Sequence, residues 1–315
     1  MTAQADNGVP EIPARLVDAI VFLRGEEEGR TWLAELPGRI LDHARRWGLS
    51  LGRIADGGAM SCCVLCVTGD GTESVLKIPL SAEAGRQEAR LLRLWGASDA
   101  VPAVLRDVPE TGVFLMSRIV PGTTAWARSG PADSCRFGEL LSRLETAEPA
   151  GPAWLQDLRE VAELRMGWAR DRFSEPRYAD DPRYAGHTAS IADAERVLAV
   201  LLETTRERHV LHADLQAKNI LCGPEGRWFA IDPMGAVGDL NAEAALWAAV
   251  QDGPATVADR LGELEAHPLL DPERLRAWTY VFAVAEYRPY LPEPAHRIEA
   301  FLADTDPREL VEQLR

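Results

Sequence analysis

Residues 209–235 read HVLHADLQAKNILCGPEGRWFAIDPMG, and the rest of the chain is organised around this stretch. Two short apolar strands lie in it next to a polar loop. The second strand follows a Gly-Pro-Glu-Gly turn, and turn residues between β-favouring runs predict a hairpin. Asp214 lies in the polar loop and Asp232 ends the second strand. We therefore expect both aspartates at loop positions where polar ends converge.

The spacing of three polar residues in this stretch indicates a chemistry. Asn219 follows Asp214 by five residues, and Asp232 ends the next strand. Phosphoryl transfer needs a carboxylate to accept or orient the attacking hydroxyl, and oxygen ligands for a magnesium ion on the phosphates. The alternative is that all three are turn formers and caps. His212 is expected to hold the loop by packing or hydrogen bonding, not to transfer a proton.

The run HADLQAKN, followed by AIDP, resembles the catalytic loop and metal-binding motif of the protein-kinase-like fold. It looks most like the aminoglycoside phosphotransferase branch, whose pattern is His-Gly-Asp, four residues, Asn and later Ile-Asp. This sequence departs from that pattern with Ala213 in place of glycine, and with Gln216 and Lys218 in the loop. Pro233 after the second aspartate is common in the antibiotic-kinase branch and disfavours a protein-kinase activation segment.

Composition limits the class of protein. The 315 residues include 46% apolar side chains, enough for a sizeable core, and have no apolar run of membrane-spanning length. The start of the chain has no signal-peptide pattern, so we expect a cytoplasmic protein, either monomer or dimer. A net charge of −15 disfavours nucleic acid and anionic membranes as partners. It is compatible with a cationic substrate, and equally with an acidic surface kept for solubility.

Cysteine and lysine usage add two expectations. Cys62, Cys63 and Cys66 have no second Cys/His pair nearby, so they are interpreted as free thiols and not as a metal site. Among 34 basic residues only Lys77 and Lys218 are lysines. A lysine kept in an arginine-rich chain indicates a need for a compact ammonium group.

The first part of the chain reads as helices followed by strands. Helical spacing covers 11–24 and 29–48, the second with a break or kink expected at Pro37. Strands are expected at 51–55, 62–68 and 74–80, as an antiparallel meander with glycine turns. A glycine-containing loop at 56–61, ending at Ser61, lies where a kinase-like fold covers the nucleotide. A helix at 82–97 then carries Glu88, favoured over Glu83 as the ion-pair partner of Lys77.

Two further strands, 103–107 and 113–119, precede a Pro-Gly pair that marks a boundary. By the resemblance, this is the hinge between lobes, and Ser117 and Ile119 supply backbone contacts to adenine. After it, helical periodicity dominates, with one loop at 174–188. The predicted fold is α+β: a protein-kinase-like two-lobed fold with a small antiparallel β lobe with one helix and a large, mainly helical lobe. The expected parts are N-terminal helices (1–49), a nucleotide-binding lobe with the hinge at its end (50–119) and a helical lobe (120–315).

The resemblance is strongest to the streptomycin 6-kinase and hydroxyurea-kinase group. It implies transfer of the γ-phosphoryl group of ATP or GTP to a hydroxyl of a small-molecule antibiotic. Carried over, Asp214 is the catalytic base, and Asn219 and Asp232 hold Mg²⁺. Lys77, oriented by Glu88, binds the nucleotide phosphates. A role for Lys218 at the γ-phosphate departs from the family's pattern.

The acceptor stays open. Asp239 and Glu243 are spaced i, i+4 near the start of a helix, so both could face a guanidino or amino substrate, with Glu286 as a further candidate. Their alternative role is to cap and stabilise the helix. The acceptor is therefore an aminoglycoside-type antibiotic, or a nucleoside antibiotic, hydroxyurea or a biosynthetic intermediate. A catalytically silent nucleotide-binding protein is the remaining alternative.

Overall fold

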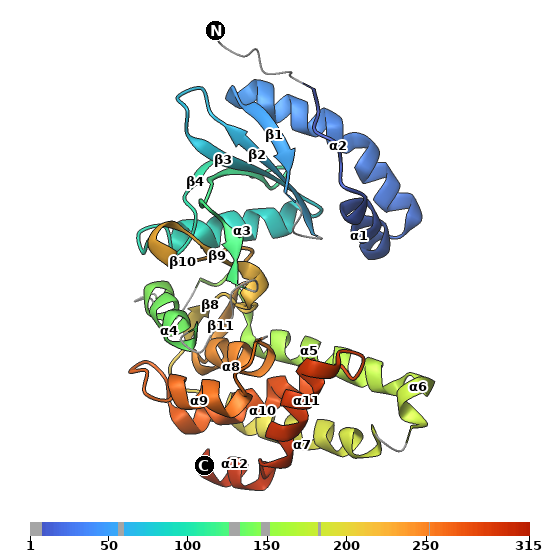
Figure 1. Ribbon diagram of the computed structural model, residues 1–315, viewed down its shortest axis with the longest axis vertical. Helices are drawn as coiled ribbons and strands as arrows, with labels where there is room; N and C mark the ends of the chain where they lie inside the picture. Colours follow the sequence, from blue (N-terminus) through green and yellow to red (C-terminus); the bar gives the residue numbers. More distant parts are fainter. Residues whose placement is uncertain (1–7, 56–59, 126–132, 146–151, 182–183, 252) are drawn as a thin grey trace. The chain divides into compact units, whose positions relative to one another are not determined.

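The computed structural model describes residues 8–55, 60–125, 133–145, 152–181, 184–251 and 253–315 (Figure 1). The chain divides into two compact units, Met1–Gly122 and Thr123–Arg315. The division falls directly after the Pro-Gly pair at 121–122. No described helix has both the length and the apolar character needed to span a membrane.

The first unit is built on a five-stranded antiparallel sheet with the order β1-β2-β3-β5-β4. The expected meander of the first three strands is confirmed, and the glycine turn at 69–71 joins β2 to β3. The strands are β1 (Ser50–Ile54), β2 (Ser61–Val67), β3 (Glu73–Pro79), β4 (Val104–Val108) and β5 (Val113–Ser117).

Two N-terminal helices, α1 (Ala14–Arg24) and α2 (Glu26–Trp47), share one hydrophobic core with this sheet. The expected break at Pro37 does not occur, because α2 continues through it. Loss of one backbone hydrogen bond at a proline is offset by burial of the helix's apolar face. The core residues of the two helices are Leu16, Ile20, Trp32, Leu36, Ile40, Ala44 and Trp47.

The opposite side of the sheet carries α3 (Ala82–Leu94), which packs on β3, β4 and β5. Side chains alternate along a strand, so Leu76 and Ile78 enter the core shared with the N-terminal helices. Lys77, between them, points the other way, toward Glu88 of α3. The sheet thus separates a purely apolar layer from a layer with an ion pair.

The second unit is mainly helical and surrounds α10, which packs against five other helices (Figure 1). Almost every residue of α10 from Leu275 onward is buried. Pro272 lies in the first turn of this helix, where proline is tolerated, and α9 begins after Thr256, which supplies a capping box. The helices are α4 (Asp133–Leu144), α5 (Leu158–Ser174), α6 (Pro176–Ala179), α7 (Ala185–Thr204), α8 (Asn241–Val250), α9 (Val257–Leu264), α10 (Pro272–Glu286), α11 (Pro292–Ala303) and α12 (Pro307–Gln313).

Two small sheets in this unit hold the polar loops. The predicted hairpin is confirmed as β9 (Ile220–Cys222) and β10 (Trp228–Ala230), with β6 (Thr123–Thr124) added at its edge. The other sheet has the order β7-β11-β8. Its strands are β7 (Gln156–Asp157), β8 (His209–Leu211) and β11 (Ala236–Gly238), the last two antiparallel. The loop between β8 and β9 contains Asp214.

Candidate active site

In the first unit, a buried ion pair links β3 to α3. Lys77 Nζ lies 2.7 Å from Glu88 Oε1, and both side chains are less than 10% exposed. Glu83, the competing partner, pairs with Arg86 at the surface. A buried lysine that keeps its charge needs such a carboxylate, because desolvation would otherwise favour the neutral amine. The pair holds an ammonium group in a fixed position on the third strand.

Three further residues expected at the nucleotide lie in this unit, whereas Lys218 belongs to the second unit. Ser61 starts β2 and is buried; the loop before it, 56–59, lies outside the described residues. Ser117 ends β5, and its peptide nitrogen donates to the carbonyl of Ala103. A nucleotide contact at Ser117 would therefore use its carbonyl oxygen. Ile119 is half-buried just after the strand.

In the second unit, the carboxylate of Asp214 is surrounded by four donors. Oδ1 accepts from Arg165 Nη2 at 2.7 Å and from Gln216 Nε2 at 2.5 Å. Oδ2 accepts from Asn219 Nδ2 at 2.9 Å and lies 3.0 Å from Lys218 Nζ. The two lysines of the chain are thus each paired with a carboxylate of the predicted site.

These donors determine the charge of Asp214. Burial by itself would raise the pKa of the carboxyl, but Lys218 and then Arg165 outweigh it, and the pKa is lowered from its usual value. The group is therefore ionised at neutral pH. A carboxylate so strongly hydrogen-bonded is a weak proton acceptor and a well-fixed acceptor of a hydroxyl hydrogen bond. This suits phosphoryl transfer, in which positioning contributes more than strong base catalysis.

His212 joins the Asp214 loop to the turn at Asp232. Its Nε2 donates to the carbonyl of Ile231 at 2.8 Å, and its Nδ1 accepts from the peptide nitrogen of Asp214. Burial lowers the pKa of this histidine, so the ring is neutral, and these partners define its tautomer. The peptide nitrogens of Met234 and Gly235 donate to the carbonyl of His212. His212 therefore has the structural role expected from the sequence.

Asn219 and Asp232, the residues expected to hold magnesium, lie on backbone segments that are hydrogen-bonded to each other. Asn219 donates Nδ2 to both the carbonyl and the carboxylate of Asp214, so its side-chain amide is oriented by the residue proposed to be catalytic. Its own carbonyl accepts from the peptide nitrogen of Ile231, directly before Asp232. In the described part of the chain, no three His, Cys, Asp or Glu side chains form a metal cluster. Magnesium at nucleotide sites typically uses one or two protein carboxylates together with phosphate oxygens.

Ala213 has a backbone conformation that favours glycine. Its φ is +64°, in the left-handed region, where a Cβ atom costs about 1–2 kcal/mol. The sequence departs from the family pattern at this position. The structure shows that the backbone shape typical of glycine is kept although the residue is alanine.

We expect Ala213→Gly to stabilise the protein by about 0.5–1 kcal/mol, because relief of the strained φ exceeds the added entropy of the unfolded chain. Urea denaturation measures this change. Ala217→Gly is the matched control: Ala217 is buried in the adjacent 3₁₀ turn, has no positive φ, and should lose stability when replaced. Equal losses in the two variants would contradict the strain at Ala213.

Glu243, a candidate either for the substrate site or for stabilising the first turn of the helix, contacts the Asp214 loop. Its Oε1 accepts from the peptide nitrogen of Ala213 at 2.6 Å, while Oε2 is buried without a hydrogen-bond partner among the described residues. Burial, aided by the charge of Asp214, raises the pKa of Glu243 to about 7. Glu243 therefore holds the strained residue in place, and is partly protonated near neutral pH.

This raised pKa predicts a pH-dependent stability. Between pH 4.5 and about 7 the folded chain keeps a proton on Glu243 that the unfolded chain has lost, so the free energy of unfolding falls as the pH rises. Glu243→Gln should remove this pH dependence. Between pH 4.5 and about 7, the free energy of unfolding of the wild type should therefore fall by about 3 kcal/mol more than that of the variant. Denaturation at pH 4.5, 6 and 7.5 measures it. Glu265→Gln, at an exposed position, should keep the wild-type pH dependence.

Asp239 lies away from Asp214. Strands β8 and β11 are antiparallel, with His209 opposite Gly238, so Asp239 follows the end of the ladder where β8 begins. Asp214 follows the other end. Helix α8 begins at Asn241, and Asp239 Oδ1 accepts from the peptide nitrogen of Asn241, which fits the alternative role of Asp239 at the start of the helix.

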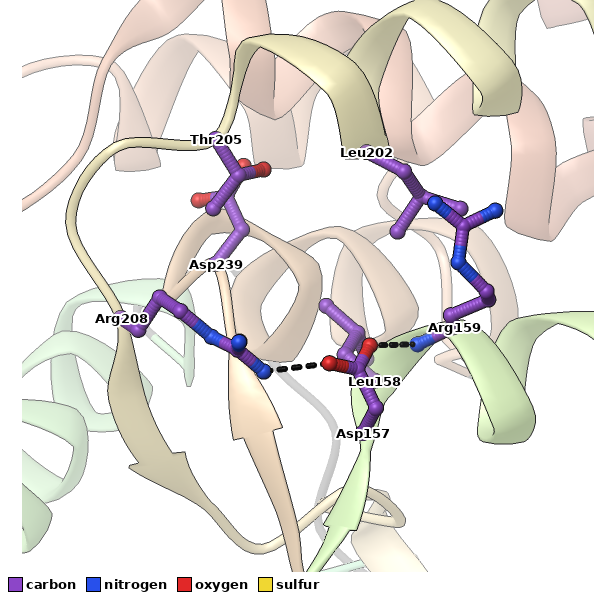
Figure 2. Close-up of a pocket in the computed structure, with 8 residues that line it drawn as sticks. Asp157, Leu158, Arg159, Leu202, Thr205, Arg208 and Asp239 are labelled. Atoms are coloured by element: carbon purple, nitrogen blue, oxygen red, sulfur yellow. Dashed lines mark hydrogen bonds and ion pairs between the residues drawn. The ribbon is translucent and has the colours of Figure 1, made fainter. Parts of the chain in front are cut away.

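The carboxylate of Asp239 is also bound within the protein. Its Oδ2 accepts from Arg274 Nε at 2.7 Å and from Trp278 Nε1 at 2.7 Å, both on α10. A pocket of about 200 Å³ does adjoin Asp239, at the same end of the ladder, as Figure 2 shows. The residues that line it are Asp157, Leu158, Arg159, Leu202, Thr205, Arg208, Gly238 and Asp239.

Glu286 is engaged as well, and its partner was missed from the sequence. Glu286 Oε1 lies 2.5 Å from Arg165 Nη1, and Oε2 lies 3.0 Å from Arg288 Nη2. Arg165 is only 3% exposed on α5 and also binds Asp214. A signal was present, since Arg165 interrupts the buried stripe of α5 that includes Ala162 and Ala169. A charge in such a stripe requires a buried partner.

Comparison with known proteins identifies kinases that act on antibiotics as relatives of this chain. A family model described as aminoglycoside/hydroxyurea antibiotic resistance kinase matches residues 46–286. A hydroxyurea phosphotransferase of Kitasatospora aureofaciens is 34% identical over 277 residues, covering 86% of this chain and 77% of the relative. A streptomycin 6-kinase of Streptomyces griseus is 31% identical over 234 residues, covering 73% of this chain and 71% of the relative.

Solved structures with the same fold are more distant in sequence. A choline/ethanolamine kinase family protein from Mesorhizobium loti has a TM-score of 0.61 at 16% identity, covering 84% of this chain and 92% of the other. Aminoglycoside phosphotransferase APH(4)-Ia has a TM-score of 0.54 at 19% identity, covering 84% and 97%. These likenesses confirm the α+β, protein-kinase-like fold predicted from the sequence.

Proposed function

This chain belongs to the aminoglycoside/hydroxyurea antibiotic resistance kinase family, and we propose that it transfers the γ-phosphoryl group of ATP to a hydroxyl of a small antibiotic, with Asp214 as the catalytic carboxylate. The observation that carries the proposal is the Asp214 carboxylate, held by four donors, on Arg165, Gln216, Lys218 and Asn219. A silent nucleotide-binding protein would have no use for a fixed, ionised carboxylate at this position.

Each of the predicted site residues has a separate role in this proposal. Asp214 accepts a hydrogen bond from the attacking hydroxyl and orients it toward the γ-phosphate. Lys77, fixed by Glu88, binds the nucleotide phosphates, and the backbone at Ser117 and Ile119 binds the base, with Ser61 contributing from the start of β2. Lys218, paired with Asp214 in the structure, contributes positive charge at the γ-phosphate.

Magnesium is part of this proposal. Asn219 and Asp232 would hold the ion, which would neutralise negative charge on the nucleotide phosphates. GTP as an alternative donor shares the same phosphates, so the phosphate-binding groups do not discriminate against it. The reaction is proposed to take place in the cytoplasm, with ATP as donor.

Among acceptors we place a small neutral molecule of the hydroxyurea type first. The three carboxylates expected to bind a cationic antibiotic are each engaged inside the protein: Asp239 by Arg274, Glu243 by the Ala213 peptide, and Glu286 by two arginines. The relative with the higher identity of the two is the hydroxyurea phosphotransferase. Streptomycin stands second, on its 31% identical 6-kinase relative.

The test is phosphate transfer from magnesium-ATP and magnesium-GTP to hydroxyurea, streptomycin and a nucleoside antibiotic, read by mass spectrometry of the acceptor. A gain of one phosphate on any of them, abolished by EDTA, supports the proposal and names the acceptor. Nucleotide binding without transfer to any acceptor, and without release of inorganic phosphate, would favour the silent-binder alternative.

A further inference from the structure

Arg165 is a charged residue placed where the helix pattern requires an apolar one. It lies in the buried stripe of α5 between Ala162 and Ala169, and is 3% exposed. Burying a guanidinium is costly unless its donors find acceptors. The position of Arg165 is therefore explained by the groups it contacts and not by packing.

Those groups are the backbone and side chain of the catalytic loop, and a second helix. Nη2 lies 2.7 Å from Asp214 Oδ1 and donates to the carbonyl of Ala213 at 3.1 Å. Nη1 lies 2.5 Å from Glu286 Oε1, at the end of α10. The planar guanidinium of Arg165 thus connects α5 to the Asp214 loop and to α10. These three partners are far from Arg165 in sequence, so the contact depends on the tertiary fold.

The strained residue before Asp214 is held from both sides by this arrangement. Its peptide nitrogen donates to Glu243, and its carbonyl accepts from Arg165. Glu286 in turn is fixed by Arg288 on its other oxygen. The direction of the Asp214 side chain therefore depends on contacts that come from α5, α8 and α10.

We propose that Arg165, held by Glu286, is a positioning residue for phosphoryl transfer, which fixes the orientation of the Asp214 carboxylate toward the acceptor hydroxyl. This inference rests on the proposed role of Asp214. A lysine would not replace the arginine, because a single ammonium lacks the planar fork that reaches two carboxylates and a carbonyl at once.

The test compares Arg165→Lys with a matched buried arginine of the same unit. Arg260 is also 3% exposed and donates to the carbonyls of Ala248 and Ala255, away from the Asp214 loop. We expect Arg165→Lys to lower kcat about 10²-fold, since small misplacements of a catalytic group have effects of this size. The KM for ATP should change less than about 3-fold, because only the chemical step loses its positioning. Arg260→Lys should lose similar thermal stability and keep its kcat.

Glu286→Gln provides a second variant that leaves Arg165 paired with Asp214 and is expected to fold. It should lower kcat less than Arg165→Lys, and the double variant should be no worse than Arg165→Lys alone, because the two residues act as a unit. Additive losses in kcat, or a kcat of Arg165→Lys equal to that of Arg260→Lys, would overturn the inference.

Failure of the proposed function gives a different result. In that case the wild type transfers no phosphate to any antibiotic, or Asp214→Asn keeps its turnover. Hydrolysis of magnesium-ATP, with water as the acceptor, lets the same comparison of Arg165 variants be made without a known antibiotic. A wild type that neither transfers phosphate nor hydrolyses ATP overturns both statements. An active, Asp214-dependent wild type with an unaffected Arg165→Lys overturns only this one.

Discussion

Asp214→Asn is expected to lower kcat by about 10³-fold, within the range usual for loss of a catalytic acid or base. Asparagine keeps the size of the side chain but offers one acceptor oxygen where the carboxylate offers two, and it has no charge for Lys218 and Arg165. The affinity for ATP should be nearly unchanged, because no nucleotide-binding group is altered. Steady-state kinetics with the acceptor found by mass spectrometry measures both quantities.

Asp239→Asn is the matched control for this prediction. Asp239 is a carboxylate of the second unit that, like Asp214, has an arginine partner, but it lies at the other end of the β8–β11 ladder. Its replacement should reduce stability and leave kcat within about 2-fold of the wild type, as expected for a residue without contact to the reacting groups. If both variants lost activity in proportion to stability, the catalytic role of Asp214 would not stand.

Lys77→Met is the second variant for which we expect a large effect, because it should lower both the stability of the protein and its activity with ATP. Removing the ammonium leaves Glu88 buried without this partner, which costs about 3–5 kcal/mol of stability. It also removes the charge proposed to bind the nucleotide phosphates, and we expect kcat/KM for ATP to fall about 10²-fold or more. Denaturation and ATP kinetics measure the two losses separately.

The double variant Lys77→Met/Glu88→Leu distinguishes these losses. Replacing a buried ion pair by apolar side chains is often neutral for stability or better, so the double variant should recover most of the stability lost by Lys77→Met. It should not recover ATP kinetics. Recovery of both would mean that Lys77 serves only the packing of α3 on the sheet, and would remove it from the nucleotide site.

The fold could be predicted largely from local patterns. The glycine turn at 69–71 and the alternating strands beside it predicted the meander, and the Gly-Pro-Glu-Gly turn predicted the hairpin of β9 and β10. Both are short-range features in which the residues that interact are neighbours in sequence. The absence of a helix break at Pro37 has the opposite origin, since burial of α2 against the sheet outweighs the local preference of proline.

The candidate site also contains residues that local sequence reveals and residues whose roles depend on distant contacts. Asp214, Asn219 and Asp232 lie within one local motif, and the structure places Asp214 and Asn219 in direct contact. The roles expected for Asp239, Glu243 and Glu286 depended on which distant groups they meet, and their partners come from other helices and loops. Arg165 contacts Asp214 across 49 residues of sequence, which no local spacing could indicate.

The shared core of the first unit affects how this chain can be cut or recombined. The family match begins at residue 46, inside the last turn of α2. A chimaera joined at that point would discard the cover that Trp32, Leu36 and Ile40 place over the sheet. The exposed strand faces would then be apolar and available for aggregation. The segment matched by the family model leaves out most of two helices that share a core with the sheet, so α1 and α2 should be exchanged together with the strands they cover.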